Sequence, residues 1–583
     1  MTHHRGLALA VSLAAAALVV AGCASIPGET IPQKANLEGG AATAAAVAQP
    51  ARNAGPLTIV RGFVNSSGDP TDGHAAARVY LAAATQKTWD RGTTPSTVDV
   101  IDSTFSTNGP FDMDNNSATV ILEAHLEGTV GSNGAFQPAN LGQASDYEIT
   151  IHLHTETGGQ WRILDPPQAL LMARSDFDHY YRPVDVYFFD QTWDVLVPDL
   201  RYVIADPANG VVPRIVQLLL DGPSASLKDA VQDAIPQDTN LKTNVDEEES
   251  GQITINLMNM QDQPSNTRQL MIAQFLRSLE NYGSSIAVES EGQPLVPNHL
   301  SWRQTDLPNY GVYIGLKATG MVVANGRVLN LADGVPIKGP AGEGTYNVVS
   351  AAESADGTEL ATVTTDPAGG EIVRIGGIDQ AETTVRDLNA SQFTRPSWTP
   401  SDANGDPSHA LWTVADNTVL RVASTPQNSW VASPVETSAL APYGQITDLR
   451  LSRDGVRVAV VAGGNLLIGA VVVDQGAVSI KQVRLIQPLL NTVTKVDWLN
   501  QDQLVIATTQ PGAPVQTLTV DGLTVDPYTS ANLSSAVTDI AASDGPPVLA
   551  VDAAGMWESP GISEAWQPPQ HPQPANAVPF YPG

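Results

Sequence analysis

A turn of the form Ser-x-Asp-Gly or Ser-Asp-Gly recurs in the C-terminal half of the chain, each time before a short apolar strand. It occurs at Ser354–Gly357, Ser452–Gly455 and Ser543–Gly545, and Asn500–Gln503 is a related polar turn. Positions 357, 455, 503 and 545 are separated by 98, 48 and 42 residues, and 98 is close to twice 49. Short strands joined by tight turns at a period of about 40–50 residues are typical of propeller blades. We therefore predict an all-β propeller of five or six blades over residues 298–583. A β-sandwich is the alternative, but sandwiches do not repeat one hairpin at a fixed spacing.

Length and charge restrict what the whole chain can be. Its 583 residues are enough for several domains, each with its own core. The 61 acidic and 30 basic residues give a net charge of −31, which opposes binding to nucleic acid and to anionic lipid head groups. The chain has one cysteine, which excludes an internal disulfide framework and a thiolate metal cluster.

That cysteine, Cys23, ends an N-terminal segment typical of an exported protein. A short basic start is followed by about fifteen apolar residues, fewer than the ~20 that a spanning helix needs. We predict that residues 1–22 are a signal peptide. The order Val20-Ala21-Gly22-Cys23 resembles the bacterial lipobox. This resemblance implies cleavage before Cys23, a diacylglyceryl thioether on its sulfur and an acyl chain on its new amino group, and hence a lipid anchor on the extracytoplasmic face of the cell membrane.

Residues 23–56 are predicted to form the lipidated cysteine and a flexible tether. The stretch is rich in Ala, Gly, Pro, Gln and Thr and contains no aromatic residue, so it cannot build a core. A flexible chain of this length has a root-mean-square reach of ~30 Å. The folded part can therefore stand off the membrane and stay near membrane partners.

Residues 57–183 are predicted to form an α+β domain. Apolar residues at helical spacing in 72–89 predict a helix with Asp72 as its cap. Alternation of apolar and polar residues then predicts strands, at 98–105, 119–126, 147–154 and 161–164. Helices followed by a curved antiparallel sheet favour an NTF2-like shape.

Residues 184–297 show the order β-α-β-α-β, with strands at 186–190, 252–257 and 285–290 and helices at 213–220 and 268–279. The first helix ends in Asp221-Gly222-Pro223, a C-cap glycine followed by a proline. The region resembles the GerMN domain of spore-germination proteins and actinobacterial lipoproteins. Its matching motifs are Tyr187-Phe-Phe189, Leu196-Val-Pro198, Arg201, Leu219-Leu-Asp-Gly-Pro223, Ile235-Pro236 and Glu291-Gly-Gln-Pro-Leu295. The resemblance implies a domain that binds protein or wall components and is not an enzyme.

Candidate metal-binding and catalytic residues form only weak sequence patterns. Asp112, Asp114, Asn116 and Glu123 have the spacing of calcium ligands, but Ser117 stands where the loop needs glycine and Glu123 lies in a predicted strand. A solvated acidic turn is therefore the favoured interpretation. His152 and His154 share a strand face but have no third ligand nearby. No cofactor and no catalytic motif is recognised.

Two further segments have an open interpretation. The acidic run Asp246–Glu249 favours a solvated loop, with a docking patch for a basic partner as the alternative. The C-terminal end, with Trp557, Trp566 and the proline-rich stretch 568–583, either closes the last blade or forms a tail. We predict that only its first half is docked.

Lipobox, tether, α+β domain, GerMN-like domain and propeller, in this order, resemble the actinobacterial LpqB lipoprotein family along the whole chain. The resemblance implies a non-catalytic envelope lipoprotein that contacts the extracellular domain of the sensor kinase MtrB through its propeller end. It also implies modulation of two-component signalling in cell division and cell-wall homeostasis.

Two other functions are weighed against this one. The first is a module that binds wall glycan or a small ligand through the first domain or the propeller channel. The second is a hydrolase whose acidic groups meet only in the fold, which would need two carboxylates ~5–10 Å apart in a cleft.

Overall fold

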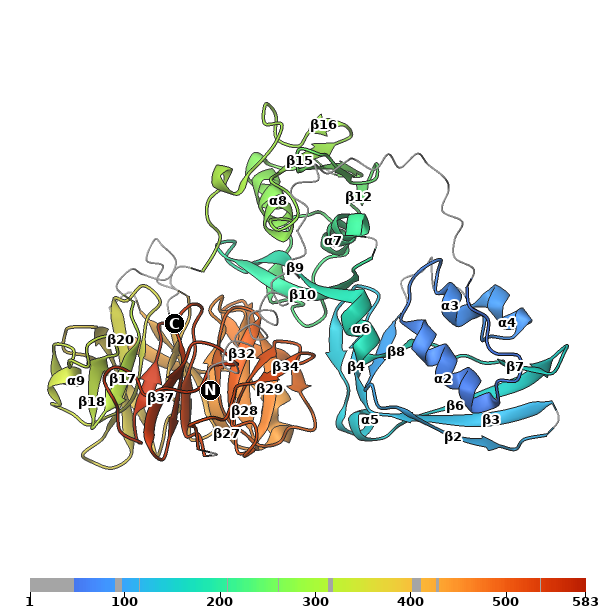
Figure 1. Cartoon of the computed structure of the whole chain (residues 1–583). Helices are drawn as coiled ribbons and strands as arrows, with labels where there is room; N and C mark the ends of the chain where they lie inside the picture. The colour runs from blue at the N-terminus through green and yellow to red at the C-terminus, as the bar shows by residue number, and fades with distance from the viewer. Residues whose placement is uncertain are drawn as a thin grey trace, which may run out of the picture. The chain divides into compact units, whose positions relative to one another are not determined.

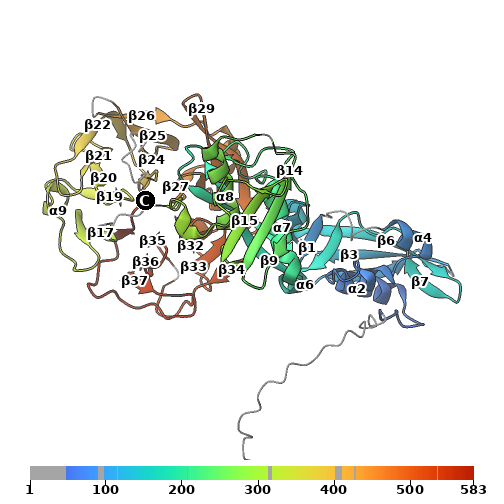
Figure 2. The same ribbon diagram turned by 90° about the horizontal axis from the view of Figure 1, so that it is seen from above.

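Small antiparallel sheets in the C-terminal half of the chain form the blades of a propeller. In this computed structural model, the described residues of that half form six sheets of three or four strands each. Figure 2 shows the sheets grouped around a common centre. The predicted propeller is confirmed, and six blades agree with the predicted five or six.

The blades follow one another along the chain, except that the first is completed by the last strand. Blade 1 has β17 (Met321–Ala324), β18 (Arg327–Asn330) and β38 (Val578–Phe580); blade 2 has β19 (Val348–Glu353), β20 (Glu359–Thr365), β21 (Glu371–Gly377) and β22 (Thr383–Ala390); blade 3 has β23 (Ser397–Trp398), β24 (Ala410–Ala415), β25 (Thr418–Ser424) and β26 (Trp430–Pro434). Blade 4 has β27 (Ile446–Leu451), β28 (Arg457–Ala462), β29 (Asn465–Asp474) and β30 (Ala477–Ile486); blade 5 has β31 (Val493–Trp498), β32 (Gln503–Thr508), β33 (Val515–Thr519) and β34 (Val525–Pro527); blade 6 has β35 (Asp539–Ala541), β36 (Val548–Asp552) and β37 (Gly555–Ser559).

Strand β38 closes the ring, because it pairs antiparallel with β17 and places Phe580 opposite Met321. Phe580 is 1% exposed and packs in an apolar cluster shared by blades 1 and 2. Trp566 is also fully buried. The prediction that only the first half of the C-terminal segment is docked is therefore wrong. Its second half supplies a buried strand whose pairing partner lies more than 250 residues earlier.

The recurring Ser-x-Asp-Gly turn is built by its own side chains. The Ser354 hydroxyl donates to Asp356 Oδ1 at 2.6 Å, and that oxygen also accepts the Thr358 N–H at 3.1 Å. The Ser354 hydroxyl accepts the Glu359 N–H at 2.9 Å. Gly357 completes the turn with φ 71°, a left-handed value that glycine adopts without strain. These polar atoms are occupied in shaping the turn, so the motif is structural.

The same bonding recurs at two other turns. Ser452 donates to Asp454 at 2.5 Å, and Thr519 donates to Asp521 at 2.6 Å. The following glycines, Gly455 and Gly522, have φ of 73° and 79°. Threonine replaces serine in the second of these turns because only the hydroxyl is needed. The sequence pattern missed this turn for that reason.

The first domain is α+β, as predicted, with its helices packed against two four-stranded sheets (Figure 1). Its helices are α2 (Pro56–Ser67), α3 (Ala75–Arg78), α4 (Ala83–Thr88), α5 (Leu141–Ser145) and α6 (Arg174–Tyr180). The sheets have the orders β5-β4-β1-β8 and β2-β3-β6-β7, from β1 (Val98–Ile101), β2 (Ser106–Phe111), β3 (Ser117–Ala124), β4 (Leu126–Val130), β5 (Phe136–Pro138), β6 (Tyr147–Glu156), β7 (Gln160–Ile163) and β8 (Leu170–Ala173).

The single helix expected over 72–89 is broken into α3 and α4. Between the two helices, Leu81 forms a β-bridge with Ile163 and is fully buried. Asp72 has φ 49° and lies in the turn before α3, so it does not cap the helix. Burying the Leu81 side chain against the sheet therefore stabilises the fold more than continuing the helix through this position would.

The second domain follows α6 directly. It contains the predicted strands and helices in sequence, but further strands lie before the first helix, between that helix and the second predicted strand, and at the end of the domain. Its elements are β9 (Tyr181–Asp190), β10 (Leu196–Ile204), α7 (Val211–Leu220), β11 (Val231–Gln232), β12 (Asn240–Leu241), β13 (Asp246–Glu247), β14 (Gln252–Met258), α8 (Ser265–Ser278), β15 (Ser285–Ser290) and β16 (Gln293–Pro294). Strands β14 and β15 are parallel and joined through α8, a β-α-β unit. Gly222 follows α7 with φ 81°, as expected of a C-cap glycine.

The structure describes residues 47–89, 97–114, 116–206, 208–260, 262–312, 318–400, 410–425, 429–534 and 536–583. Residues 49–583 form one unit. Among the described residues, no helix has the length and apolarity needed to cross a membrane. The signal peptide, the lipobox residues Val20, Ala21 and Gly22, Cys23 and most of the tether lie outside the described residues.

Candidate binding face on the propeller

One end of the propeller, which we call the turn face, carries the Ser-x-Asp-Gly turns. Each of these turns joins the innermost strand of a blade to the second strand, so the turns lie at the same end of their sheets. Because strands alternate in direction, the turn between the third and fourth strands of blade 5 lies at this end too. The turn face therefore includes 354–357, 452–455, 500–502, 519–523 and 543–547.

Blades 4 and 5 use this face to hold the second domain. The Arg457 guanidinium donates to the carbonyl oxygen of Pro198 in β10, and Gln501 Nε2 donates to the carbonyl of Leu196 at 3.3 Å. Val456 and Val472 are buried in one apolar cluster with the core of the second domain. Part of the turn face is thus an interface between domains of this chain.

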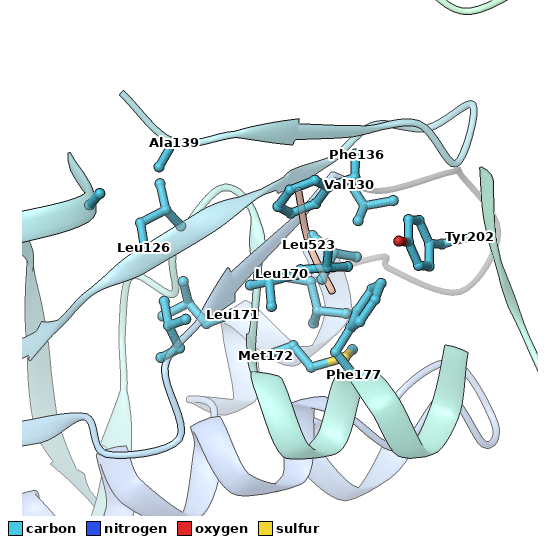
Figure 3. Close-up of a cluster of buried hydrophobic side chains, with 14 of the residues drawn as sticks. Leu126, Val130, Phe136, Ala139, Leu170, Leu171, Met172, Phe177, Tyr202 and Leu523 are labelled. Carbon is cyan, nitrogen blue, oxygen red and sulfur yellow. The ribbon is translucent and has the colours of Figure 1, made fainter. Parts of the chain in front are cut away.

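The first domain is held by the turn that begins at Thr519. Leu523, 3% exposed, lies among the side chains of Phe136, Leu170 and Phe177 (Figure 3). The Arg174 guanidinium donates to the carbonyl of Leu523 at 2.6 Å. An apolar side chain and a charge-assisted bond to its backbone therefore join the first domain to blade 5.

Acidic groups meet at the boundary of the second domain and the propeller. Burial, and then the charge of Asp502, raise the pKa of Asp185 to about 7. Asp199 is fully buried, but Arg201 pairs with it at 2.7 Å and keeps its pKa below the usual range despite that burial. Asp185 is thus affected by a carboxylate of the propeller, whereas the cation that pairs with Asp199 lies in its own strand, β10.

The remainder of the turn face, over blades 5, 6 and 1, is hollowed into two pockets. The first has a volume of 470 Å³ and the second a volume of 520 Å³. Both are lined by Ser543, Asp544 and Pro546, so the two pockets adjoin at the turn of blade 6. We call the two pockets together the blade 6 groove. It has the size of a ligand or peptide site.

Acidic and apolar side chains line the blade 6 groove. Asp526 and Asp544 line the first pocket, and Asp544 and Glu558 line the second. The described lining includes no Lys, Arg or His. Its apolar members include exposed Ile562, together with Leu499, Leu331, Leu549, Pro547, Pro569 and Pro582. The groove is therefore suited to a ligand with both positive charge and apolar groups.

A buried ionic network lies near the centre of the ring. Arg395 donates to Asp497 at 2.8 Å and lies 3.9 Å from Asp539. Arg450 pairs with Asp448 at 3.2 Å and donates to the carbonyl of Arg395. Burial opposes the charge of Arg395, but the surrounding aspartates hold its pKa above the usual range. Arg395, which comes just before the first strand of blade 3, therefore pairs with carboxylates of blades 5 and 6, and its carbonyl links blade 3 to the neighbouring blade 4.

Two buried glutamates bear on the hydrolase alternative. Burial, and then Asp356, raise the pKa of Glu353 to about 8, and burial raises the pKa of Glu382 to about 7. Such shifts suit a general acid in many enzymes. However, neither residue is among those that line the blade 6 groove. The two groups are placed in blade 2, apart from the groove.

The spaced oxygen ligands of the calcium pattern lie on a β-hairpin. Asp114 Oδ1 accepts the N–H groups of Asn116 and Ser117, both at 2.6 Å, and so shapes the turn. Glu123 lies at the far end of β3, where its carboxylate accepts hydrogen bonds from Ser106 and Asn108. Asp112 has φ 48° before that turn. Across the described ranges, no group of three His, Cys, Asp or Glu side chains could hold a metal ion.

The strand β6 carries the two predicted histidines. His152 Nδ1 lies 2.6 Å from Asp165 Oδ2, and His154 Nε2 lies 3.9 Å from Glu156. Each histidine faces a different carboxylate. His152 is exposed, whereas His154 is half-buried and its Nε2 atom is covered.

The acidic run of the second domain, 246–249, is exposed and partly strand, because β13 pairs with β14 at its edge. Glu248 accepts hydrogen bonds from Ser250 and Gln252. The run therefore lies on the second domain, whereas the blade 6 groove belongs to the propeller.

No sequence pattern indicates the groove or the docking role of Leu523. The groove depends on segments of three blades that meet only when the ring closes, and Leu523 depends on first-domain side chains that lie far earlier in the chain. A Thr-x-Asp-Gly search would have found the turn at Thr519. It would not have shown what that turn contacts.

Comparison with known proteins supports the architecture. The chain matches three protein-family descriptions: "Lipoprotein LpqB, N-terminal domain" over residues 49–178, "Sporulation and spore germination" over 185–296 and "Lipoprotein LpqB beta-propeller domain" over 322–582. Lipoprotein LpqB of Rhodococcus opacus is 28% identical over 95% of this chain and 92% of its own length. Lipoprotein LpqB of Nocardia farcinica is 28% identical over 94% and 93%.

Among solved structures, the tandem GerMN domains of the sporulation protein GerM from Bacillus subtilis are 16% identical and cover 25% of this chain and 56% of that one, with a TM-score of 0.19. Together, the domains and family matches define a multidomain bacterial lipoprotein with a GerMN-like domain and a C-terminal propeller. The chain belongs to the LpqB lipoprotein family.

Proposed function

We propose that this chain is a non-catalytic accessory protein of the cell envelope that binds the extracellular domain of the sensor kinase MtrB. The observation that carries the proposal is the division of the turn face. Blades 4 and 5 use their turns to hold other folded domains, and the blade 6 groove leaves the same kind of surface open. A surface built for protein contacts is thus available to a partner.

Bound to the kinase, the protein would modulate two-component signalling in cell division and cell-wall homeostasis. The partner and this role come from the family resemblance. The domain contacts support them in one respect: they join the propeller to the first domain, which follows the tether in the sequence. A partner held by the propeller would therefore be coupled to the anchored end of the chain.

The anchor in this proposal is Cys23, lipidated after cleavage of residues 1–22 and facing the outside of the cell membrane. Acyl chains contribute ~0.8 kcal/mol per buried methylene, and several chains on one residue hold a protein stably. For Cys23→Ala we expect an uncut precursor and loss of the acylated form. Metabolic labelling with a fatty acid and detergent-phase partitioning measure both. Normal labelling of the variant would contradict lipidation at this residue.

The partner assignment is tested by titrating the MtrB extracellular domain against the full chain held in detergent micelles. We expect saturable binding, and its loss when the partner domain is heat-unfolded. Binding of an unrelated kinase's extracellular domain serves as the control. If no saturable binding to the native domain appears, the assignment is wrong.

A further inference from the structure

The blade 6 groove is continuous across the turn of blade 6. Ser543, Asp544 and Pro546 line both of its pockets, so a ligand in one pocket borders the other. The first pocket reaches blade 5 at Asp526, and the second reaches Glu558 and the residues after blade 1's β18. A ligand that filled both would be long and would cross blade 6.

Carboxylates are distributed along the whole groove. Asp526 lies in the first pocket, Asp544 borders both pockets, and Glu558 lies in the second. Asp526 and Asp544 are exposed and Glu558 is half-buried. The charge of Glu558 also acts on the neighbouring Tyr581, whose pKa is raised mainly by burial and then by this carboxylate. A complementary ligand would therefore carry several positive charges at intervals.

Apolar surface lies between these carboxylates. Ile562 is 40% exposed in the first pocket, and Pro547, Leu549 and Pro582 line the second. By contrast, the ring faces that sugar ligands stack on are not offered, since Tyr528 and Tyr581 are only 5% and 8% exposed. An anionic wall polymer is disfavoured because the described lining has no basic residue.

We propose that the blade 6 groove binds an extended polypeptide segment that carries lysine or arginine side chains spaced by apolar residues. Spaced cations would meet the three carboxylates, and the apolar residues between them would contact Ile562 and the prolines. This inference deepens the proposed function by giving the chemistry of the partner's docking segment. It depends on that function only for the identity of the partner.

The probe is a fluorescent twelve-residue peptide that alternates lysine and proline, an extended chain of about 37 Å. Its binding to the full chain in uncharged detergent is measured by fluorescence anisotropy. We expect saturable binding that Asp544→Lys with Glu558→Lys weakens by at least tenfold. The matched control is Glu247→Lys with Glu249→Lys, which makes the same change in net charge on the exposed acidic run. It should change the affinity by less than twofold.

Equal losses in the two double variants would show attraction to net charge alone and overturn the groove. Displacement of the peptide by an uncharged chito-oligosaccharide would assign the groove to glycan and overturn the proposal, as would failure of the wild-type chain to bind the peptide saturably. Asp544→Asn with Glu558→Gln, a milder change, should weaken binding by several fold. Its thermal unfolding, compared with that of the wild type, separates lost binding from lost folding.

A second arm uses the MtrB extracellular domain with the same variants. If the wild-type chain binds this domain and the groove variant binds it equally, the kinase docks elsewhere and the groove is not its site. If the wild-type chain binds the peptide through the groove but does not bind the kinase domain, the partner assignment fails and the groove stands. The two proposals therefore fail separately.

Discussion

Replacing Arg395 with leucine is expected to destabilise the propeller by about 3–5 kcal/mol, the usual cost of removing one partner from a buried ion pair. The side chain is 6% exposed and donates to Asp497 and to the backbone carbonyls of Ile540 and Pro579. Leucine would leave Asp497 and Asp539 buried without this cation. It would also remove a bond to the strand that closes the ring.

Thermal unfolding followed by circular dichroism measures this effect. For a domain of this size, we expect the Tm to fall by roughly 10 °C. Arg386→Leu, at an exposed arginine of blade 2, is the matched control and should change the Tm by about 1 °C. Arg395→Leu with Asp497→Leu should recover part of the loss, because no unpaired charge is then left at position 497. A Tm within 2 °C of the wild type for the single variant would contradict the structural role of the network.

Replacing Leu523 with aspartate is expected to release the first domain from blade 5. The substitution places a charge among Val130, Phe136, Leu170 and Phe177, in a site that the leucine fills almost without exposure. Deleting a buried leucine side chain alone costs about 2–5 kcal/mol, and an unpaired buried carboxylate adds to that cost. The turn itself should persist, because the Thr519–Asp521 bond and Gly522 are unchanged.

Small-angle scattering and limited proteolysis report this release. We expect a larger radius of gyration and new cleavage near α6, with the propeller's unfolding transition retained. Leu489→Asp, at a leucine that is 58% exposed, is the control and should leave both measurements unchanged. An unaltered radius for Leu523→Asp would mean that the first domain is held chiefly by other contacts.

The propeller and the second domain were predictable because their signals are local. A Ser-x-Asp-Gly turn makes its hydrogen bonds within six residues, so the residue pattern alone is enough to predict the geometry of the turn. Similarly, Gly222 ends α7 through its own backbone conformation. Recurrence of such local signals at a fixed spacing then indicates the ring.

Features that depend on distant contacts were not predictable. Strand β38 is three residues long in a proline-rich stretch, and its strand character comes from pairing with β17. Trp398 and Trp498 each donate to a carbonyl on the inner strand of the preceding blade, at 3.0 and 3.1 Å, which no local pattern indicates. The calcium-like spacing of Asp112, Asp114, Asn116 and Glu123 is a local pattern, but it does not correspond to a binding loop. These residues are spread along a β-hairpin, with Glu123 at the far end of β3.

The central claim is that the free part of the turn face, at the blade 6 groove, receives a partner protein. Hydrogen–deuterium exchange of the full chain, with and without the MtrB extracellular domain, tests it most directly. We expect slower exchange on binding at 499–503, 517–528, 543–549 and 558–570, and unchanged exchange at the acidic run 246–249. Protection confined to the second domain, or no protection anywhere in the propeller at saturating partner, would contradict it.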